Sequence, residues 1–583
     1  MRRRHWHSLF CLVAACLALA GADQAAPHFQ RGMTALHNFE YEEANEAFRQ
    51  ARAIDPGFAL AYWGEAITYY QVLWRNENVD AARRALAGLA PTAAARAAKA
   101  GSAREKGLLA AAEILFGEGD PNTRHARYAD AMGALSASQP DDPDIASLHA
   151  LALMGTVSRS IIGYSDAHDV HQPGLAGSEL QRRVAAILDR VLASHPEHPG
   201  ALHYLIHDYD DPEHAQRALP AARAYAKVAG GASHALHMPA HVFLQLGLWG
   251  EAAASDRAAW AASTDWVARK SLPPSLRNFH ALAWLQYELL QTGRYREAWE
   301  AIGQIEPVVK ASGALSRDAG SSSPQPLLSD LSSMRARFAI ETRRWDLLAH
   351  SRDFGNVNEL FAIGVSAART GDLKTAEVVR QTLAGRSRSA QEGDLRPAIT
   401  IMEREVAALI ALAGGHRDEA VEILQAAASA EDALPPPLGL PEPLKPAPEL
   451  LGEVLLEAGR PGNAVEPFER TLTRHANRSQ SVLGLARAAA AMGDNASAGR
   501  HYARLLANYD GADADLPELV EARTYLKKGR GPAPPSTNRG VVIALAGSVM
   551  LAIALLWMRQ RTRARRLAPQ KTEPRLKTQR TRK

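Results

Sequence analysis

Histidines are concentrated in one part of this chain. Twelve of its 21 histidines lie between residues 149 and 280 of a 583-residue sequence. Two pairs there have the spacing of one helical turn, His203 with His207 and His237 with His241. Residues i and i+4 share a helix face, so each pair can direct two imidazoles at one point. If neighbouring hairpins place the two helices side by side, the four rings are predicted to meet at one metal ion.

Other polar residues of the same segment are expected to add ligands or to orient the four rings. They are His149, Asp208, Asp210, His214, His234 and His280. Both cysteines, Cys11 and Cys16, fall in the N-terminal apolar segment. The ligands are therefore expected to be histidine, carboxylate or methionine, for one divalent ion of zinc, copper or iron.

Two other interpretations of the histidines remain open. They can pack between helices, each ring giving its N–H to a neighbouring carbonyl, or they can line a pocket for an anionic ligand. Pro239 bears on the metal interpretation because proline disfavours helical backbone in the residue before it. If a helix begins at Pro239, His237 precedes its first turn and only approximately faces His241.

The sequence carries no complete catalytic motif around these histidines. Tyr204 and Met238 stand where a zinc protease has its glutamate, so a general base would have to come from Asp208 or Glu213. Phosphate-binding, nucleophile-elbow and dinucleotide motifs are also absent from the sequence. The acidic and histidine residues of 166–171 are expected in a solvated loop. A metal-dependent enzyme is thus the alternative to a binding protein.

The elements that position the histidines are predicted to be helical hairpins. Gly32, Ala44, Phe48, Ala51 and Pro56 follow the spacing of a 34-residue tetratricopeptide repeat. Partial copies of the pattern recur, led by Gly364, Ala408, Gly452 and Ala486. Because each hairpin buries its apolar face only against its neighbours, an all-α tetratricopeptide-type solenoid is expected over residues 23–530. Loops are expected at 312–326 and 434–448, which are rich in serine, glycine or proline.

An early aromatic run offers a possible binding surface. Its members have helical spacing and are Tyr62, Trp63, Tyr69, Tyr70 and Trp74. Core packing is the expected role. The alternative is a concave face that binds a protein or peptide, for which tyrosine and tryptophan make good anchors.

The two ends of the chain predict export and membrane anchoring. Residues 1–22 have the basic start, short apolar run and small-residue cleavage site of a signal peptide, although Cys16 also fits lipoprotein processing. Residues 540–558 are uncharged and long enough to span a bilayer, after a proline-rich tether at 531–539. Residues 559–583 hold 11 Lys or Arg and one acid, which predicts a cytoplasmic tail. We expect a single-pass inner-membrane protein with residues 23–530 in the periplasm.

The charge balance changes once these ends are set apart. The signal, Arg539 and the tail carry +14, so the remaining domain has a net charge of −10 within a whole-chain net of +4. Nothing in that domain points to nucleic acid. The expected partners are a protein or peptide on the concave face, and the membrane through the C-terminal helix.

Several segments resemble a widespread bacterial family of tetratricopeptide-repeat proteins and, more distantly, the tetratricopeptide-repeat protein 38-like group. The most specific are HPGALHYLIHDYDDPEHA and HALHMPAHVFLQLGLW, which contain both histidine pairs. The resemblance spans about His28 to Tyr509 and also includes AYWGEAITYY and LPPPLGLPEPLKPAPELLGE. It implies the repeat fold and intact histidine motifs, and it implies no substrate.

Overall fold

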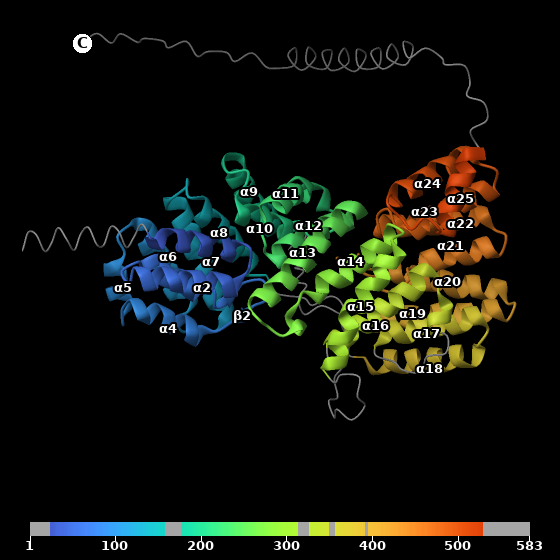
Figure 1. Ribbon diagram of the computed structural model, residues 1–583, viewed down its shortest axis with the longest axis horizontal. Coiled ribbons are helices and arrows are strands. Elements are labelled where there is room, and N and C mark those ends of the chain that lie inside the picture. The colour runs from blue at the N-terminus through green and yellow to red at the C-terminus, as the bar shows by residue number, and fades with distance from the viewer. Residues whose placement is uncertain (1–23, 158–176, 313–325, 349–355, 391–394, 529–583) are drawn as a thin grey trace, which may run out of the picture. The chain divides into compact units, whose positions relative to one another are not determined.

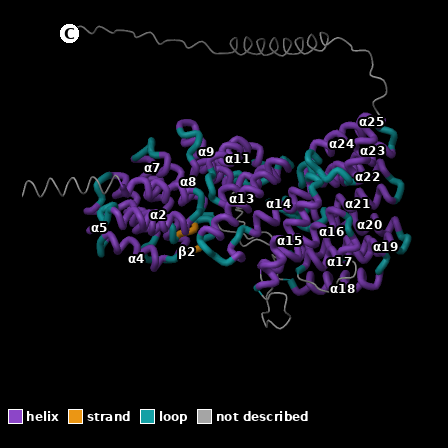
Figure 2. The backbone as a smooth tube through the Cα atoms, viewed as in Figure 1, coloured by secondary structure: helices purple, strands orange, loops and turns teal. Residues whose placement is uncertain are grey.

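The computed structural model describes residues 24–157, 177–312, 326–348, 356–390 and 395–528. Almost all regular structure in these ranges is helical (Figures 1 and 2). After a helical stretch at 24–37, the first helices are α2 (Tyr41–Ile54), α3 (Ala59–Ile67), α4 (Val79–Leu89), α5 (Ala93–Lys99), α6 (Ala103–Leu115), α7 (Pro121–Ser138) and α8 (Pro143–Met154). One short strand pair follows α3, β1 (Tyr70–Gln71) with β2 (Asn76–Glu77), which the sequence did not predict.

The histidine-rich segment forms five complete helices and the start of a sixth. They are α9 (Glu179–Ser194), α10 (Pro199–Asp208), α11 (Ala215–Val228), α12 (Ser233–Gln245) and α13 (Trp249–Arg269), followed by the 3-10 turn η1 (Pro274–Leu276) and α14 (Phe279–Gln291). The remaining elements are α15 (Tyr295–Ala311), α16 (Pro326–Thr342), η2 (Trp345–Leu347), α17 (Val357–Thr370), α18 (Leu373–Ser389), α19 (Arg396–Ala413), α20 (Arg417–Asp432), α21 (Ala447–Glu457), α22 (Pro461–Arg474), α23 (Ser479–Ala491), α24 (Asn495–Asn508) and α25 (Pro517–Lys528).

A phenylalanine between two glycines marks the repeat packing. A β-carbon at Gly32 would lie 2.7 Å from the ring of Phe48, and one at Gly64 would lie 2.6 Å from it. The same arrangement recurs at Phe468, which fills the space beside Gly452 and Gly484. The small residues let helices approach closely and the aromatic ring fills the gap. The described residues therefore form a tetratricopeptide-type α-solenoid, as the sequence predicted.

Turns between paired helices use glycine in left-handed backbone. Gly371 ends α17 with φ of 87°, and Gly415 has the same φ between α19 and α20. Residues with a β-carbon rarely adopt this conformation. The two turns are 44 residues apart, which agrees with the irregular spacing of the sequence pattern.

Helices far apart in the sequence also meet. The Tyr225 hydroxyl donates to Asn38 Oδ1 at 2.9 Å, and Trp266 Nε1 donates to Glu43 at 2.9 Å. These bonds join α11 and α13 to the first repeat. Trp249 Nε1 likewise donates to the carbonyl of Asn477 at 2.9 Å. Repeats far apart in the sequence are thus in direct contact.

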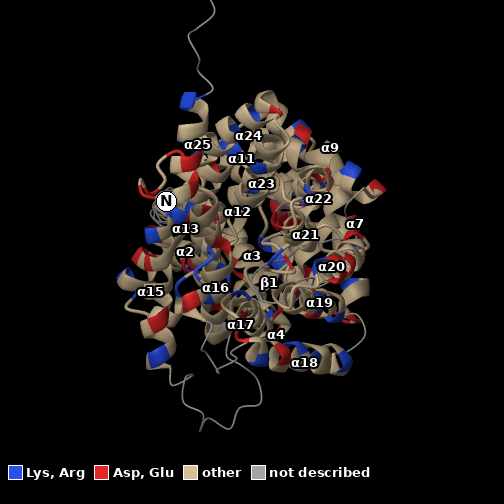
Figure 3. Ribbon diagram, turned by 90° about the vertical axis from the view of Figure 1, so that its right-hand side faces the viewer, with Lys and Arg blue, Asp and Glu red and all other residues tan. Residues whose placement is uncertain are grey.

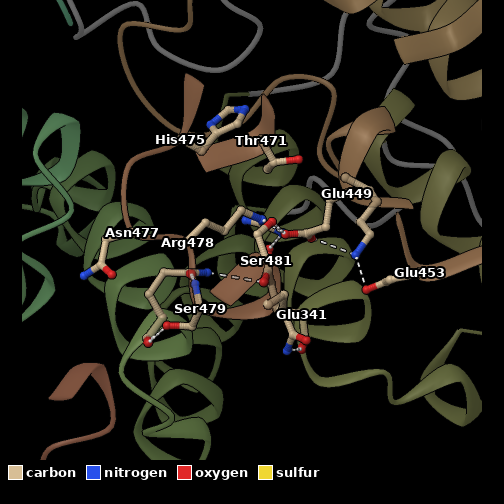
Figure 4. Close-up of polar contacts among 12 residues, drawn as sticks. Glu341, Glu449, Glu453, Thr471, His475, Asn477, Arg478, Ser479 and Ser481 are labelled. Atoms are coloured by element: carbon tan, nitrogen blue, oxygen red, sulfur yellow. Dashed lines mark hydrogen bonds and ion pairs between the residues drawn. The ribbon is translucent and has the colours of Figure 1, made fainter. Parts of the chain in front are cut away.

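A buried charged group lies where four helices meet (Figure 4). Arg478, at the start of α23, is fully buried and donates to Glu449 of α21 at 2.8 Å. It also donates to Glu341 of α16 at 2.5 Å and to the Tyr287 hydroxyl oxygen of α14 at 3.0 Å. One guanidinium therefore joins α14, α16 and α21 to the last repeats.

The predicted signal peptide (1–22), the tether, the apolar segment 540–558 and the basic tail lie outside the described residues, as do residues 166–171. Within the ranges that are described, no helix combines the length and apolarity needed to cross a bilayer. Along the ribbon of Figure 3, acidic and basic residues are interspersed.

Candidate metal centre

The helix α12 is continuous through Pro239. It runs from Ser233 to Gln245 with Pro239 inside it. His237 and His241 therefore lie one turn apart on a single helix, which begins before Pro239. The start of α12 is held by Ser233, whose hydroxyl donates to the Ala259 carbonyl of α13 and accepts from Asn278, the N-cap of α14.

Three histidines from α12 and α14 converge, and we call His237, His241 and His280 the carboxylate triad. The Nε2 atom of His237 lies 2.9 Å from Nε2 of His241 and 2.9 Å from Nε2 of His280. One ligand atom from each ring lies within 4.8 Å of the others. All three side chains are buried, at 2%, 2% and 5% exposure.

Two carboxylates determine which ring nitrogens of the triad carry protons. Asp256 of α13 contacts Nδ1 of His237, and Asp210, in the α10–α11 turn, lies 2.9 Å from Nδ1 of His241. Carboxylates accept hydrogen bonds, so the two Nδ1 atoms are the donors. In the neutral rings, Nε2 of His237 and His241 then both present lone pairs. Two lone pairs 2.9 Å apart repel unless a cation lies between them.

This geometry fits a transition-metal site. Bonds of about 2.0–2.1 Å to a tetrahedral ion place two ligand nitrogens about 3.3 Å apart, close to the observed separations. Histidine ligands characteristically give their other ring N–H to a carboxylate, as His237 and His241 do. A divalent ion here would be balanced by Asp210 and Asp256.

A tryptophan and a buried glutamate complete the surroundings of the carboxylate triad. The Trp284 ring stacks on His241 with centroids 4.5 Å apart and also contacts His237 and His280. Glu288 of α14 is fully buried, and burial holds its pKa well above the usual range. It is therefore a protonated carboxyl beside Asp256 at neutral pH.

A second group, which we call the aromatic triad, consists of His203, His207 and His234. Nε2 of His203 lies 3.2 Å from Nε2 of His207, and one ligand atom from each ring lies within 4.8 Å of the others. The Phe39 ring contacts all three imidazoles. Burial lowers the pKa of His203 to about 3 and holds that of His207 well below its usual value.

The four histidines predicted to share one ion are thus divided between two triads. The pair on α10 is completed by His234, and the pair on α12 by His280. The pair on α10 faces His234 of α12, whereas the pair on α12 faces His280 of α14. His207 and His241 still lie close enough for each charge to affect the other.

A third cluster of possible ligands is explained by hydrogen bonds. His37 and His198 both donate from Nε2 to Asp144 Oδ1, at 3.0 and 3.2 Å. Nδ1 of His198 accepts the Ala201 amide as the cap of α10, and Nδ1 of His37 is paired with the Tyr204 hydroxyl. Every ring nitrogen of this cluster has a partner, so it does not need an ion.

Four other predicted residues lie in neither triad. The carboxyl of Asp208 has no hydrogen-bond partner among the described residues, and burial with Asp211 and Asp189 nearby raises its pKa to about 9. His214 pairs with Asp211 at 2.7 Å. Glu213 is exposed, and His149 packs against Gly133. Their proximity in sequence did not bring them to the imidazoles.

Sequence reasoning identified Asp210 as a supporting group and missed Asp256, Trp284 and Glu288. Asp256 lies 19 residues after His237. No local spacing rule links them, because their contact depends on how α13 packs on α12. Trp284 and Glu288 do carry a signal: they follow His280 at i+4 and i+8 and so share its helix face.

The early aromatic run is mostly core. Tyr62, Trp63 and Tyr70 are buried, whereas Tyr69 and Trp74 are half-buried. Trp74 packs edge-on against His234 with centroids 5.4 Å apart. The expected core role is thus confirmed for the three buried members, and Trp74 belongs to the wall of the aromatic triad.

No protein-family model matches the chain, and no curated protein matches it. A tetratricopeptide repeat protein from Parabacteroides merdae is 13% identical, with 51% of this chain and 97% of that chain covered and a TM-score of 0.29. Yeast Tom70 is 11% identical, with 87% and 96% covered and a TM-score of 0.29. A human IFIT1 dimer with PPP-AAAA is 13% identical, with 83% and 94% covered and a TM-score of 0.28. At such TM-scores these likenesses carry no argument about function.

Proposed function

We propose that this protein is a tetratricopeptide-type scaffold that holds one divalent transition-metal ion at the carboxylate triad. One observation supports the ion above all others. Nε2 atoms of His237 and His241 face each other at 2.9 Å while the other nitrogen of each ring contacts a carboxylate. A cation satisfies both lone pairs, and the three neutral imidazoles leave room for a fourth ligand.

The ion acts as a structural link between hairpins. Its ligands come from α12 and α14, and the supporting carboxylates come from α13 and the α10–α11 turn. Binding only to the folded arrangement stabilises it by RT ln(1 + [L]/Kd). The burial of all three ligands favours this role over the alternative of a metal-dependent enzyme, which needs a substrate at the ion.

The metal proposal is tested on the full chain. We expect one equivalent of zinc, copper or iron in the purified protein and a melting temperature that falls on chelation. His280→Ala removes a ligand and abolishes both effects. His416→Ala is the control, because His416 is an exposed histidine between α19 and α20. Unchanged metal content in His280→Ala, or a metal-free protein that melts alike with and without chelator, would refute the proposal.

The scaffold role concerns a protein or peptide partner on the concave face of the solenoid. The repeat fold supports it because stacked hairpins build an extended binding surface. The carboxylate triad would keep that surface rigid by fixing neighbouring hairpins. Cross-linking of the full chain in its own cells, followed by identification of the captured protein, tests this role. The captured partner should be displaced by substitutions on the concave face and unaffected by substitutions on the convex face.

We also propose that the scaffold is held at the outer face of the inner membrane. The signal-like residues 1–22, the uncharged segment 540–558 and the basic residues 559–583 support this topology. Alkaline phosphatase fused after Lys583 should be inactive, because that enzyme works only in the periplasm. An active fusion, or release of the protein from membranes by high salt, would contradict it.

A further inference from the structure

The aromatic triad is not used by the proposed metal centre, although its spacing also suits an ion. Nε2 of His203 and Nε2 of His207 are 3.2 Å apart, and His234 brings a third nitrogen. Bonds of about 2.0 Å at trigonal or tetrahedral angles separate ligand nitrogens by about 3.3–3.5 Å. The α12 helix supplies a ligand to each triad, His234 to one and His237 to the other.

The tautomer of His203 is determined by a distant part of the chain. Its Nδ1 lies 2.7 Å from the backbone carbonyl oxygen of His37, 166 residues earlier. A carbonyl only accepts, so Nδ1 is the donor and Nε2 carries a lone pair. That lone pair faces His207. The first repeat therefore orients His203 as a ligand in the way that outer partners orient metal-binding histidines.

The two triads differ in their contacts with carboxylates. Asp210 and Asp256 contact ring nitrogens of the carboxylate triad. Within the described part of the chain, no carboxylate hydrogen-bonds to His203 or His207.

The walls of the aromatic triad are rings instead. Phe39 lies with its centroid 4.4 Å from that of His203, Tyr225 stacks on the same imidazole at 5.1 Å, and Trp74 contacts His234. The aromatic triad thus offers imidazole nitrogens walled largely by rings, with the charge of Asp210 near enough to act on His207.

Charge in such a surrounding is costly, and the cost rises with the square of the ion's charge. A monovalent ion therefore loses about a quarter as much solvation as a divalent ion of the same size. Among metals bound by imidazole, copper is the one with a stable monovalent state in biology. Cu(I) also accepts low coordination numbers, which three imidazoles satisfy without a further anionic ligand.

We propose that His203, His207 and His234 form a second, separate metal centre that binds Cu(I), beside the divalent ion of the carboxylate triad. The inference goes beyond the proposed function and does not need it, since the two centres share no ligand. The protein would then hold two ions of unlike charge on neighbouring hairpins.

The test loads the full metal-free chain with Zn(II) alone, with Cu(I) alone under anaerobic reducing conditions, and with both. The wild type should take up one equivalent of each. His207→Ala should lose the copper equivalent and keep the zinc, and His241→Ala should lose the zinc and keep the copper. Circular dichroism checks that each variant is folded. X-ray absorption of the copper-loaded wild type should show three imidazole nitrogens around Cu(I), which keeps the test decisive if His207→Ala does not fold.

The other outcomes can be told apart, and the first three overturn this proposal. Loss of both metals in both variants means that one ion is shared by the two triads. Zinc uptake that survives His241→Ala and disappears in His207→Ala means that the divalent ion lies at the aromatic triad. Zinc uptake as expected without any copper uptake leaves the proposed function standing and removes the second centre. Copper uptake without zinc uptake leaves the second centre standing and removes the proposed function.

Discussion

Nε of Arg478 lies 2.8 Å from Oε2 of Glu449, and both side chains are fully buried. Burial alone would raise the pKa of Glu449, but Arg478 and Lys445 together hold it well below its usual range. The guanidinium also binds Glu341 at 2.5 Å. This ion pair is therefore part of a network whose members depend on one another.

Removing Arg478 should be among the most damaging single changes in the protein. Arg478→Met leaves Glu341 and Glu449 buried with less positive charge, which costs about 3–5 kcal/mol. Adding Glu449→Gln to it should recover part of that loss. Chemical denaturation of the single and double variants measures both. Additive effects of the two substitutions would contradict the coupling.

The glycines beside Phe468 should not accept a methyl group. A β-carbon at Gly484 would lie 2.3 Å from the Phe468 ring, so Gly484→Ala should destabilise the protein by about 1–3 kcal/mol. Phe468→Leu in the same chain should relieve part of the clash. Gly303→Ala is the control, because its β-carbon would meet nothing within 4 Å on an exposed face of α15, and it should stabilise by about 0.5–1 kcal/mol. Thermal melts compare the variants.

His475 should make the fold sensitive to acid. Burial, with Arg478 and Arg474 nearby, lowers its pKa to about 3, below the value near 6.5 of an unfolded chain. The unfolded state binds the proton more readily, so stability is complete above about pH 6.5 and falls by up to about 1.4 kcal/mol per unit toward pH 3. His475→Gln cannot gain that proton. As the pH is lowered from 7.5 to 4.5, the melting temperature of His475→Gln relative to wild type should therefore rise. The exposed His416→Gln should show no such trend.

Asp208 should make the fold less stable as the pH rises. Its pKa in the folded protein is about 9, above the unfolded value near 3.9, so the folded state retains a proton that the unfolded chain releases. Stability from this group is complete below about pH 4 and is lost as the pH rises toward 9. Asp208→Asn imitates the protonated form. It should match wild type at pH 4.5 and exceed it by about 1–3 kcal/mol at pH 8. An equal difference at both pH values would show that the carboxyl is not the cause.

The fold could be predicted from a few residue types because their contacts and turns follow from short, fixed spacings in the sequence. Gly32, Phe48 and their counterparts at Gly452 and Phe468 recur at fixed spacing, and the structure packs them against one another as that spacing implies. Left-handed glycines such as Gly371 likewise mark hairpin turns. The strand pair at β1 and β2 escaped notice because each strand has only two residues, too few for an alternating pattern.

The candidate site could be predicted only in part because its ligands meet through packing. The i, i+4 spacing correctly placed His203 with His207 and His237 with His241. Which third histidine joins each pair depends on how α10, α12 and α14 lie against one another, and sequence spacing does not contain that information. Pro239 left the start of this helix open in the sequence, because proline suits a first turn, and the structure places it inside α12 although its ring removes one backbone donor.

Asp256 should tune the metal without binding it. It contacts Nδ1 of His237 and is fully buried, so it holds the ring with Nε2 toward the other two histidines. In Asp256→Asn the amide oxygen can still accept from Nδ1, but the negative charge is lost. Divalent-ion affinity should weaken about 10–100-fold, the usual effect of removing such a partner, while the stoichiometry stays at one ion in the carboxylate triad. Competition against a chelator of known affinity measures the change.

The control is Asp265→Asn, because Asp265 is an exposed aspartate on the same helix α13, and this variant should bind the ion as wild type does. If Asp256→Asn and Asp265→Asn bind equally well, Asp256 is a packing residue and the argument from ring tautomers loses its support.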